Sequence, residues 1–477
     1  MEKKIITPTS SNGKKINLLI AFHLVLFLIG IFYLLPTDDD WGYLVAPKLE
    51  GFNFNSFLPN GSFWRPIDAF VGLINNSYPI LFPFFNHLLI GCGFLLSIYY
   101  LYKILKLLGF EGIPLNVSIS IFIVSPAALG TVLGIDSINQ MYSVCFGLIG
   151  IYQYLRKKYL LWIIVSILAV FAKENGIVYF VIPPLIGYLN KKSIKEVIKH
   201  CLWGGLIIII YMILRFALQV SSIHIEEDSP YAFTLTRKLT DIVSFVVGST
   251  SVVDFISLIH KPSRNIFIVV LTFLVSALFL FTIFKNKKVI NKDILILTFC
   301  MVVAASPHLV THFGPMHAYS TIPYFCLIVA FILHKDRGIY EKKLFNYAFI
   351  LYVITAIAVD WHHWYRTYES SKIGPLMAKE CLDKTEGKPQ NVLCISFKDE
   401  FPRFSSFCVP PRDVFHTGSA VLRETGWTYP KKLKTLIVEK ESDIKKAISE
   451  NEGQYDCIWI QNKYDVAVIN KGKGAVR

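Results

Sequence analysis

Three consecutive carboxylates, Asp38, Asp39 and Asp40, follow directly after an apolar run from Ile16 to Leu35. Adjacent carboxylates repel one another, so such a group favours a bound cation, a proton held on one acid, or work as a base on a group that arrives there. A solvated loop that keeps the end of the apolar run in water is the alternative. A cation held by these hard oxygen ligands would make activity sensitive to a chelator.

A second candidate is Arg65, which lies in the run Phe63-Trp64-Arg65-Pro66 within a loop rich in aromatic residues. This composition is typical of segments that lie in the membrane interface. A guanidinium offers a planar fork of donors that fits phosphate oxygens. The run therefore predicts either that Arg65 binds a lipid phosphate or that it is an interfacial arginine whose charged end reaches the membrane surface.

Charged residues also occur among the apolar runs further along the chain. Lys173 and Glu174 stand between two apolar runs, where they are expected to pair with each other or to line an aqueous cavity. Arg215 lies within or at the end of another run, and an unpaired cation at the centre of a span costs roughly 2.5 to 3.5 kcal/mol. It needs an anion: a lipid-linked phosphate, an internal carboxylate, or the membrane surface.

Three histidines, His308, His312 and His317, gather at the end of one apolar run. Their spacing matches no closed four-ligand zinc pattern, so hydrogen bonding to a substrate or to loops is the favoured interpretation and no metal site is predicted. The run Trp361-His362-His363-Trp364 is interpreted as an aromatic belt where the chain leaves the membrane for the last time.

These residues belong to a chain of 477 residues that is 53% hydrophobic, 14% aromatic and only 17% charged. Such a composition excludes an ordinary soluble enzyme and predicts a polytopic α-helical membrane protein. The formal charge of +14 is scattered in small clusters between apolar runs, which topology explains better than a nucleic-acid partner does.

Apolar runs flanked by Lys and Arg predict roughly eleven transmembrane helices. The fifth and sixth are short and could be tilted or broken. The expected spans are Ile16 to Leu35, Phe84 to Leu108, Pro114 to Leu133, Ser137 to Leu155, Tyr159 to Ala172, Ile177 to Leu189, Cys201 to Leu218, Ile266 to Phe284, Ile294 to Leu309, Ser320 to Leu333 and Phe345 to Val359.

Positive charge alternates from one connection to the next, and short loops rich in Lys and Arg stay in the cytoplasm. This places the N-terminus inside. The acid triplet, the first external loop over residues 36–83, Asp136, the Lys173-Glu174 pair and the tail are then expected outside, in what would be a bacterial inner (plasma) membrane.

The chain divides into a transmembrane region over residues 1–361 and a tail over residues 362–477. Short apolar runs at Asn391 to Ser396, Leu433 to Val438 and Cys457 to Ile460, with a charged helical stretch at Asp443 to Ser449, predict a small extracytoplasmic α/β domain. Four cysteines in the tail leave three possible pairings and the expectation of one disulfide, against the alternative of four buried thiols: Cys381, Cys394, Cys408 and Cys457.

The order of these features resembles the GT-C superfamily of integral-membrane glycosyltransferases, especially the protein O-mannosyltransferase-like branch and its bacterial relatives. A first helix is followed by Asp-Asp-Trp, an aromatic-Arg-Pro loop, Asn86-His87 at the start of the second helix, and Lys-Glu before a Pro-containing helix. The likeness is detailed from Ile16 to Leu189 and only architectural beyond.

The resemblance implies a hexosyl or pentosyl transferase that takes its sugar from a polyprenyl-phosphate donor and transfers it, with inversion, to a glycan, lipid or protein acceptor outside the cytoplasm. No cofactor is implied. Asp39 would be the catalytic base, with the register open by one residue to Asp40. The donor and acceptor cavity would be lined by Asp38, Arg65, Asp136, Lys173, Glu174, Arg215, His308 and His312.

Two other classes fit the same membrane setting. A flippase or transporter of a lipid-linked saccharide would use a charged cavity without bond making, although transporters tend to keep ionisable residues near the bilayer midplane and to show internal symmetry. A lipid-linked polysaccharide polymerase or ligase would instead use a pyrophosphate-linked oligosaccharide.

Overall fold

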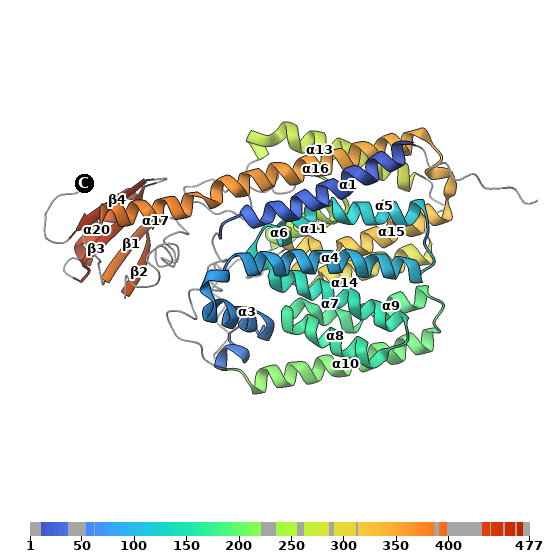
Figure 1. The fold of residues 1–477 in the computed structure, drawn as a ribbon. Coiled ribbons are helices and arrows are strands. Elements are labelled where there is room, and N and C mark those ends of the chain that lie inside the picture. Colours follow the sequence, from blue (N-terminus) through green and yellow to red (C-terminus); the bar gives the residue numbers. More distant parts are fainter. Residues whose placement is uncertain are drawn as a thin grey trace, which may run out of the picture.

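The protein is described here by a computed structural model. It describes residues 11–36, 54–61, 63–220, 235–254, 262–285, 291–311, 313–385, 391–397, 432–438, 440–451, 454–462 and 465–470. A body of helices occupies most of the chain, and a small sheet lies beyond one end of it (Figure 1). That end of the helical body is called the sheet-side end below.

The body combines long and short helices. The α-helices are α1 (Ser11–Gly30), α3 (Pro66–Ser77), α4 (Phe84–Leu107), α5 (Ile113–Ile123), α6 (Leu129–Val132), α7 (Ile138–Leu155), α8 (Tyr159–Ala172), α9 (Ile182–Leu189), α10 (Ile194–Ala217), α11 (Leu235–Thr250), α13 (Pro262–Phe284), α14 (Lys292–Val310), α15 (Ile322–Lys335), α16 (Lys343–Ser371) and α17 (Ile373–Lys384).

Short 3₁₀ segments link many of these helices. They are η1 (Ile31–Tyr33), η3 (Phe54–Phe57), η4 (Pro79–Leu81), η5 (Pro126–Ala128), η6 (Ile135–Ser137), η7 (Glu174–Phe180), η9 (Pro315–Ser320) and η10 (Arg337–Ile339).

Local sequence signals fix several of the helix starts. The Ser193 side chain accepts a hydrogen bond from the backbone N–H of Glu196 (3.2 Å) and so caps α10. Asn291 caps α14 in the same way, through the backbone N–H of Ile294 (3.2 Å). Pro66 occupies the first turn of α3, where its missing N–H leaves no hydrogen bond unmade.

Six helices of the described residues are long and apolar enough to cross a membrane, and the bent pair α5–α6 makes a seventh if it counts as one span. The chain is therefore a helical membrane protein. An apolar helix lies at each predicted span, but the predicted count of eleven is not confirmed, because some helices are short. Helices α8 and α15 have 14 residues each, α9 has eight, and α5 and α6 meet at 44°.

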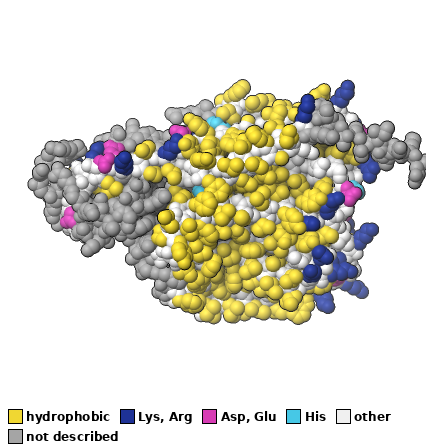
Figure 2. Space-filling view, viewed as in Figure 1, with side chains coloured by type: hydrophobic (Ala, Val, Ile, Leu, Met, Phe, Trp, Pro, Cys, Tyr) yellow, Lys and Arg dark blue, Asp and Glu magenta, His cyan; other side chains and the backbone are white. Residues whose placement is uncertain are grey.

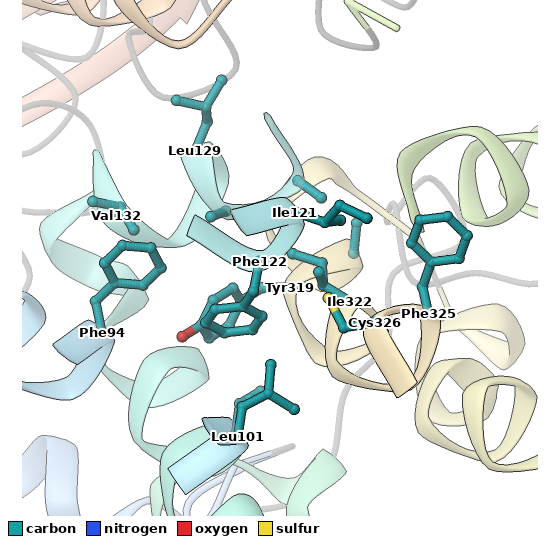
Figure 3. Close-up of a cluster of buried hydrophobic side chains, with 14 of the residues drawn as sticks. Phe94, Leu101, Ile121, Phe122, Leu129, Val132, Tyr319, Ile322, Phe325 and Cys326 are labelled. Carbon is teal, nitrogen blue, oxygen red and sulfur yellow. The ribbon is translucent and has the colours of Figure 1, made fainter. Parts of the chain in front are cut away.

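Charge and hydrophobicity are segregated on the surface. On the face shown in Figure 2, hydrophobic side chains cover the helical body, and Lys and Arg gather at the end away from the sheet. A cluster of buried hydrophobic side chains from α4, α5, α6, η9 and α15 lies inside the body (Figure 3). At its centre the ring of Phe122 lies 5.9 Å from those of Phe94 and Tyr319, between ring centroids.

The C-terminal sheet has the strand order β2-β1-β3-β4, from β1 (Asn391–Phe397), β2 (Lys432–Val438), β3 (Cys457–Asn462) and β4 (Asp465–Asn470). Strand β1 is parallel to β2 and to β3, whereas β4 is antiparallel to β3. Helix α20 (Glu441–Glu450) connects β2 to β3. The three predicted strand runs and the predicted helical stretch fall on β1, β2, β3 and α20; β4 was not predicted.

The cysteines of the tail differ from the expectation of a disulfide. Cys381, Cys394 and Cys457 are free, buried thiols, and Cys408 lies outside the described residues. Burial raises the pKa of the Cys457 thiol to about 11 and that of the Cys394 thiol well above its usual range. These groups therefore act as small hydrophobic side chains between the sheet and α17.

Candidate functional site

Two segments far apart in the sequence meet through the carboxylate of Glu174. The backbone N–H of Trp64 donates to Oε1 (2.7 Å), and the Arg65 side chain donates from Nε to Oε2 (3.0 Å). Each side chain of the ion pair is 22% exposed. Both oxygens of Glu174 thus hold the turn that precedes α3, and Figure 1 places α3 at the sheet-side end. Of the two alternatives for Lys173 and Glu174, mutual pairing is not found, because Glu174 bonds to Arg65 instead.

Aromatic rings surround this ion pair. The Arg65 guanidinium lies 4.2 Å from the centroid of the Phe63 ring. The buried Trp64 ring packs between Phe171 of α8 and Tyr211 of α10, with centroids 5.2 Å away in both cases. A cation on an aromatic face gains roughly 0.5 to 2 kcal/mol, depending on its exposure. These contacts fix the loop against two helices.

Lys173 ends α8 in an extended conformation and lies almost wholly inside the protein, 7% exposed. Its ammonium lies 3.8 Å from the sulfur of Met316, a weak partner for a cation. Burial and the neighbouring Arg65 lower the pKa of Lys173 to about 8, although the nearby carboxylates of Asp136, Glu174 and Asp68 oppose the shift. A lysine with this pKa is mostly charged at neutral pH and is easily neutralised.

The turn after Lys173 requires a glycine. A Cβ at Gly176 would stand 2.3 Å from the backbone carbon and oxygen of Ala169, closer than real Cβ atoms come. We expect Gly176→Ala to destabilise the protein by about 1–3 kcal/mol, because the chain must move away from α8. Gly205→Ala is the control, since a Cβ there meets nothing within 4 Å. Thermal unfolding in detergent measures both, and equal unfolding temperatures would contradict the expectation.

Two carboxylates lie next to these cations. The Asn139 amide donates to Asp68 Oδ2 (3.1 Å) and to the backbone oxygen of Asp136 (2.9 Å), and Ser137 donates to Asp136 Oδ1 (3.2 Å). Asp68 stands in the first turn of α3, where the helix dipole favours a negative charge. The sequence reasoning missed Asp68, although its place three residues after Arg65 was a usable signal.

The histidines connect to the site through one asparagine. Asn175 follows Glu174, and its amide nitrogen lies 2.9 Å from His308 Nε2, while its oxygen accepts from Ser143 (3.1 Å). The His308 ring stacks on His317, with centroids 3.7 Å apart. No group of three metal-ligand residues occurs here among the described residues. His308 therefore holds the Lys173-to-Gly176 turn through Asn175, as a hydrogen-bond partner.

The other predicted residues fall into two sets. Arg215 is in the last turn of α10, and Tyr211 one turn earlier lies within electrostatic reach of Arg65, Glu174 and Arg215. Asp38, Asp39, Asp40 and His312 lie outside the described residues. Four of the predicted residues therefore lie together: Arg65, Asp136, Lys173 and Glu174. Asp68 joins them, whereas His308 and Arg215 lie at the edge of this group.

The fold and this site define a helical membrane protein that carries a polar group of two cations and three carboxylates at the end of its helices. No protein-family model matches the chain, and a search of curated proteins finds no match either. Cations and carboxylates in one partly enclosed place can bind an anion and move a proton beside it.

Proposed function

We propose that the protein is a membrane glycosyltransferase that transfers a hexosyl or pentosyl group from a polyprenyl-phosphate donor to an acceptor on the extracytoplasmic face. One observation carries the proposal: the aromatic-Arg-Pro turn and the Lys-Glu turn, 109 residues apart, are joined by Arg65 and Glu174. These are the two segments that resemble motifs of GT-C glycosyltransferases. Their contact supports a shared donor site.

The reaction forms one bond and breaks another. The acceptor oxygen bonds to the anomeric carbon of the sugar, the bond from that carbon to the phosphate oxygen breaks, and polyprenyl phosphate leaves with the bonding electrons. In this proposal a carboxylate, Asp39, takes the acceptor's proton. Lys173 and Arg65 neutralise the charge that develops on the leaving phosphate. Glu174 orients the Arg65 guanidinium through Nε.

The number of membrane spans and their orientation are also part of this proposal. We infer roughly eleven spans in a GT-C-like arrangement, an N-terminus in the cytoplasm, and the tail over residues 362–477 outside. The gathering of Lys and Arg at the end away from the sheet supports this orientation (Figure 2). The sheet and α3 would then share the outer side.

A donor-turnover assay tests the function. Purified protein in detergent is given a radiolabelled polyprenyl-phosphate sugar and membrane extract as the acceptor source. We expect label to leave the lipid and free polyprenyl phosphate to accumulate. A flippase would release no lipid phosphate, and a polymerase or ligase would turn over only a pyrophosphate-linked oligosaccharide. Either result would replace the proposal, and Glu174→Gln serves as the impaired control.

A further inference from the structure

Helix α16 carries two buried pairs of a histidine and a carboxylate. His23 of α1 lies 3.3 Å from Asp360 through Nε2, and His363 Nε2 lies 2.7 Å from Oδ1 of Asp254. In the second pair both side chains are 1% exposed. Ionisable groups are costly inside a membrane protein and commonly mark a functional place. The two pairs differ in whether a third possible metal ligand lies next to them.

Only the second pair has a third ligand group beside it, among the described residues. Asp254, His362 and His363 each offer one atom, and the three atoms lie within 4.8 Å of one another. The two rings are 5.2 Å apart at an angle of 79°. Nε2 of His362 is buried and has no hydrogen-bond partner among the described residues. A buried ring nitrogen without a partner is costly unless something binds it.

We propose that Asp254, His362 and His363 bind a divalent transition-metal ion, with Zn²⁺ as the expected ion. Two imidazole nitrogens and one carboxylate oxygen are a common donor set for Zn²⁺, whereas Mg²⁺ and Ca²⁺ prefer oxygen ligands alone. Ligand atoms about 2.0–2.1 Å from a tetrahedral ion lie roughly 3.3 Å apart. The three candidate ligand atoms lie within 4.8 Å of one another, and the 2.7 Å contact between His363 Nε2 and Asp254 Oδ1 would lengthen to admit the ion.

The surrounding structure already holds Asp254 in place. Its backbone N–H donates to Thr272 Oγ1 of α13 (3.2 Å), and that hydroxyl donates to the carbonyl of Ile268. The ion would tie the segment that follows α11 to α16, and α16 continues through α17 toward the sheet (Figure 1). This inference does not rest on the proposed glycosyltransferase activity. It also differs from the cation considered for the acid triplet.

Metal content tests the proposal. The full-length protein in detergent is equilibrated with Zn²⁺, freed of excess ion, and analysed by mass spectrometry for about one Zn²⁺ per chain. We expect His362→Ala and Asp254→Asn to weaken Zn²⁺ binding at least tenfold, since loss of a mere supporting contact costs about 10- to 100-fold. A protein that retains no Zn²⁺, or variants that bind as tightly as the unaltered chain, would overturn the assignment.

The first pair supplies a matched control. Asp360→Asn alters the other histidine–carboxylate pair on the same helix, and because Asp360 acts on His363 only through its charge, it should weaken Zn²⁺ binding far less than the ligand variants do. An equal loss in that variant would mean that binding follows the state of α16 and would also overturn the assignment. If the ligand variants fail to fold, Co²⁺ added to the unaltered protein decides: visible absorption of Co²⁺ that Zn²⁺ displaces supports the site, and its absence refutes it.

Discussion

Replacing Lys173 by Met is expected to reduce sugar transfer by about 10²- to 10³-fold, the usual effect of removing one preorganised group that stabilises charge in a transition state. Met has a stem of similar length and suits a buried place. Because burial disfavours the ammonium, the variant should unfold at the same or a higher temperature. Initial rates of label release, measured beside thermal unfolding, separate lost chemistry from lost folding.

The pH dependence gives an independent check on Lys173. Its pKa is lowered from 10.5 to about 8, so the charge is lost as the pH rises through 8, and transfer should fall there. Stability moves in the opposite direction: between the two pKa values the unfolded chain binds more protons, so the contribution of Lys173 to stability rises with pH. The fall in transfer should therefore not come from unfolding.

Lys173→Arg is the matched control, because a guanidinium stays charged throughout this range. It should keep part of the activity and lose the fall in rate above pH 8. Full transfer by Lys173→Met, or the same alkaline fall in Lys173→Arg, would contradict the role of the Lys173 charge.

Apolar runs and charge predicted the positions of the helices well. In a membrane the backbone must satisfy its own hydrogen bonds, so an apolar run between basic clusters usually forms a helix. The number of spans was harder. The charged pair Lys173-Glu174 marked a break between α8 and α9, but whether these short helices count as full spans depends on the 3₁₀ geometry of η7, which hydropathy does not encode. The bend between α5 and α6 is hidden in the same way.

The candidate site was predictable only by residue type. Arg65 and Glu174 could be singled out as charges in apolar surroundings, but their bond joins segments 109 residues apart, which no local pattern encodes. Pairing of Glu174 with its neighbour Lys173 was one of two alternatives that the sequence left open, and the structure instead joins Glu174 to Arg65. Asp68 was missed because a carboxylate in the first turn of a helix is ordinary in sequence.

The two histidines of α16 were also interpreted from their sequence neighbours alone. Flanking tryptophans made His362 and His363 look like part of an interfacial belt. In the structure, His363 is buried against Asp254, which lies 109 residues earlier, just after α11. The even number of cysteines in the tail suggested a disulfide, but pairing depends on the distances between their sulfur atoms, and Cys381, Cys394 and Cys457 are free thiols in the structure.

Replacing Asp39 by Asn is expected to slow transfer by about 10²- to 10⁴-fold, the contribution of a general base. Asn keeps the size of the side chain and cannot take a proton from the acceptor hydroxyl, so donor binding should persist. Asp38→Asn is the comparison variant and should lose much less of the rate, because Asp38 lines the cavity and shapes the field of its neighbours without taking the proton. Initial rates and binding of the labelled donor, measured on the same preparations, separate the two effects.

Three outcomes revise this assignment in different ways. An active Asp39→Asn protein beside an inactive Asp40→Asn protein would move the base by one residue. Full activity in all three Asn variants would exclude the triplet as the source of the base and direct attention to Asp68 and Asp136, which lie beside Lys173. Loss of transfer on chelation that Asp254→Asn does not reproduce would instead favour a cation held by the triplet.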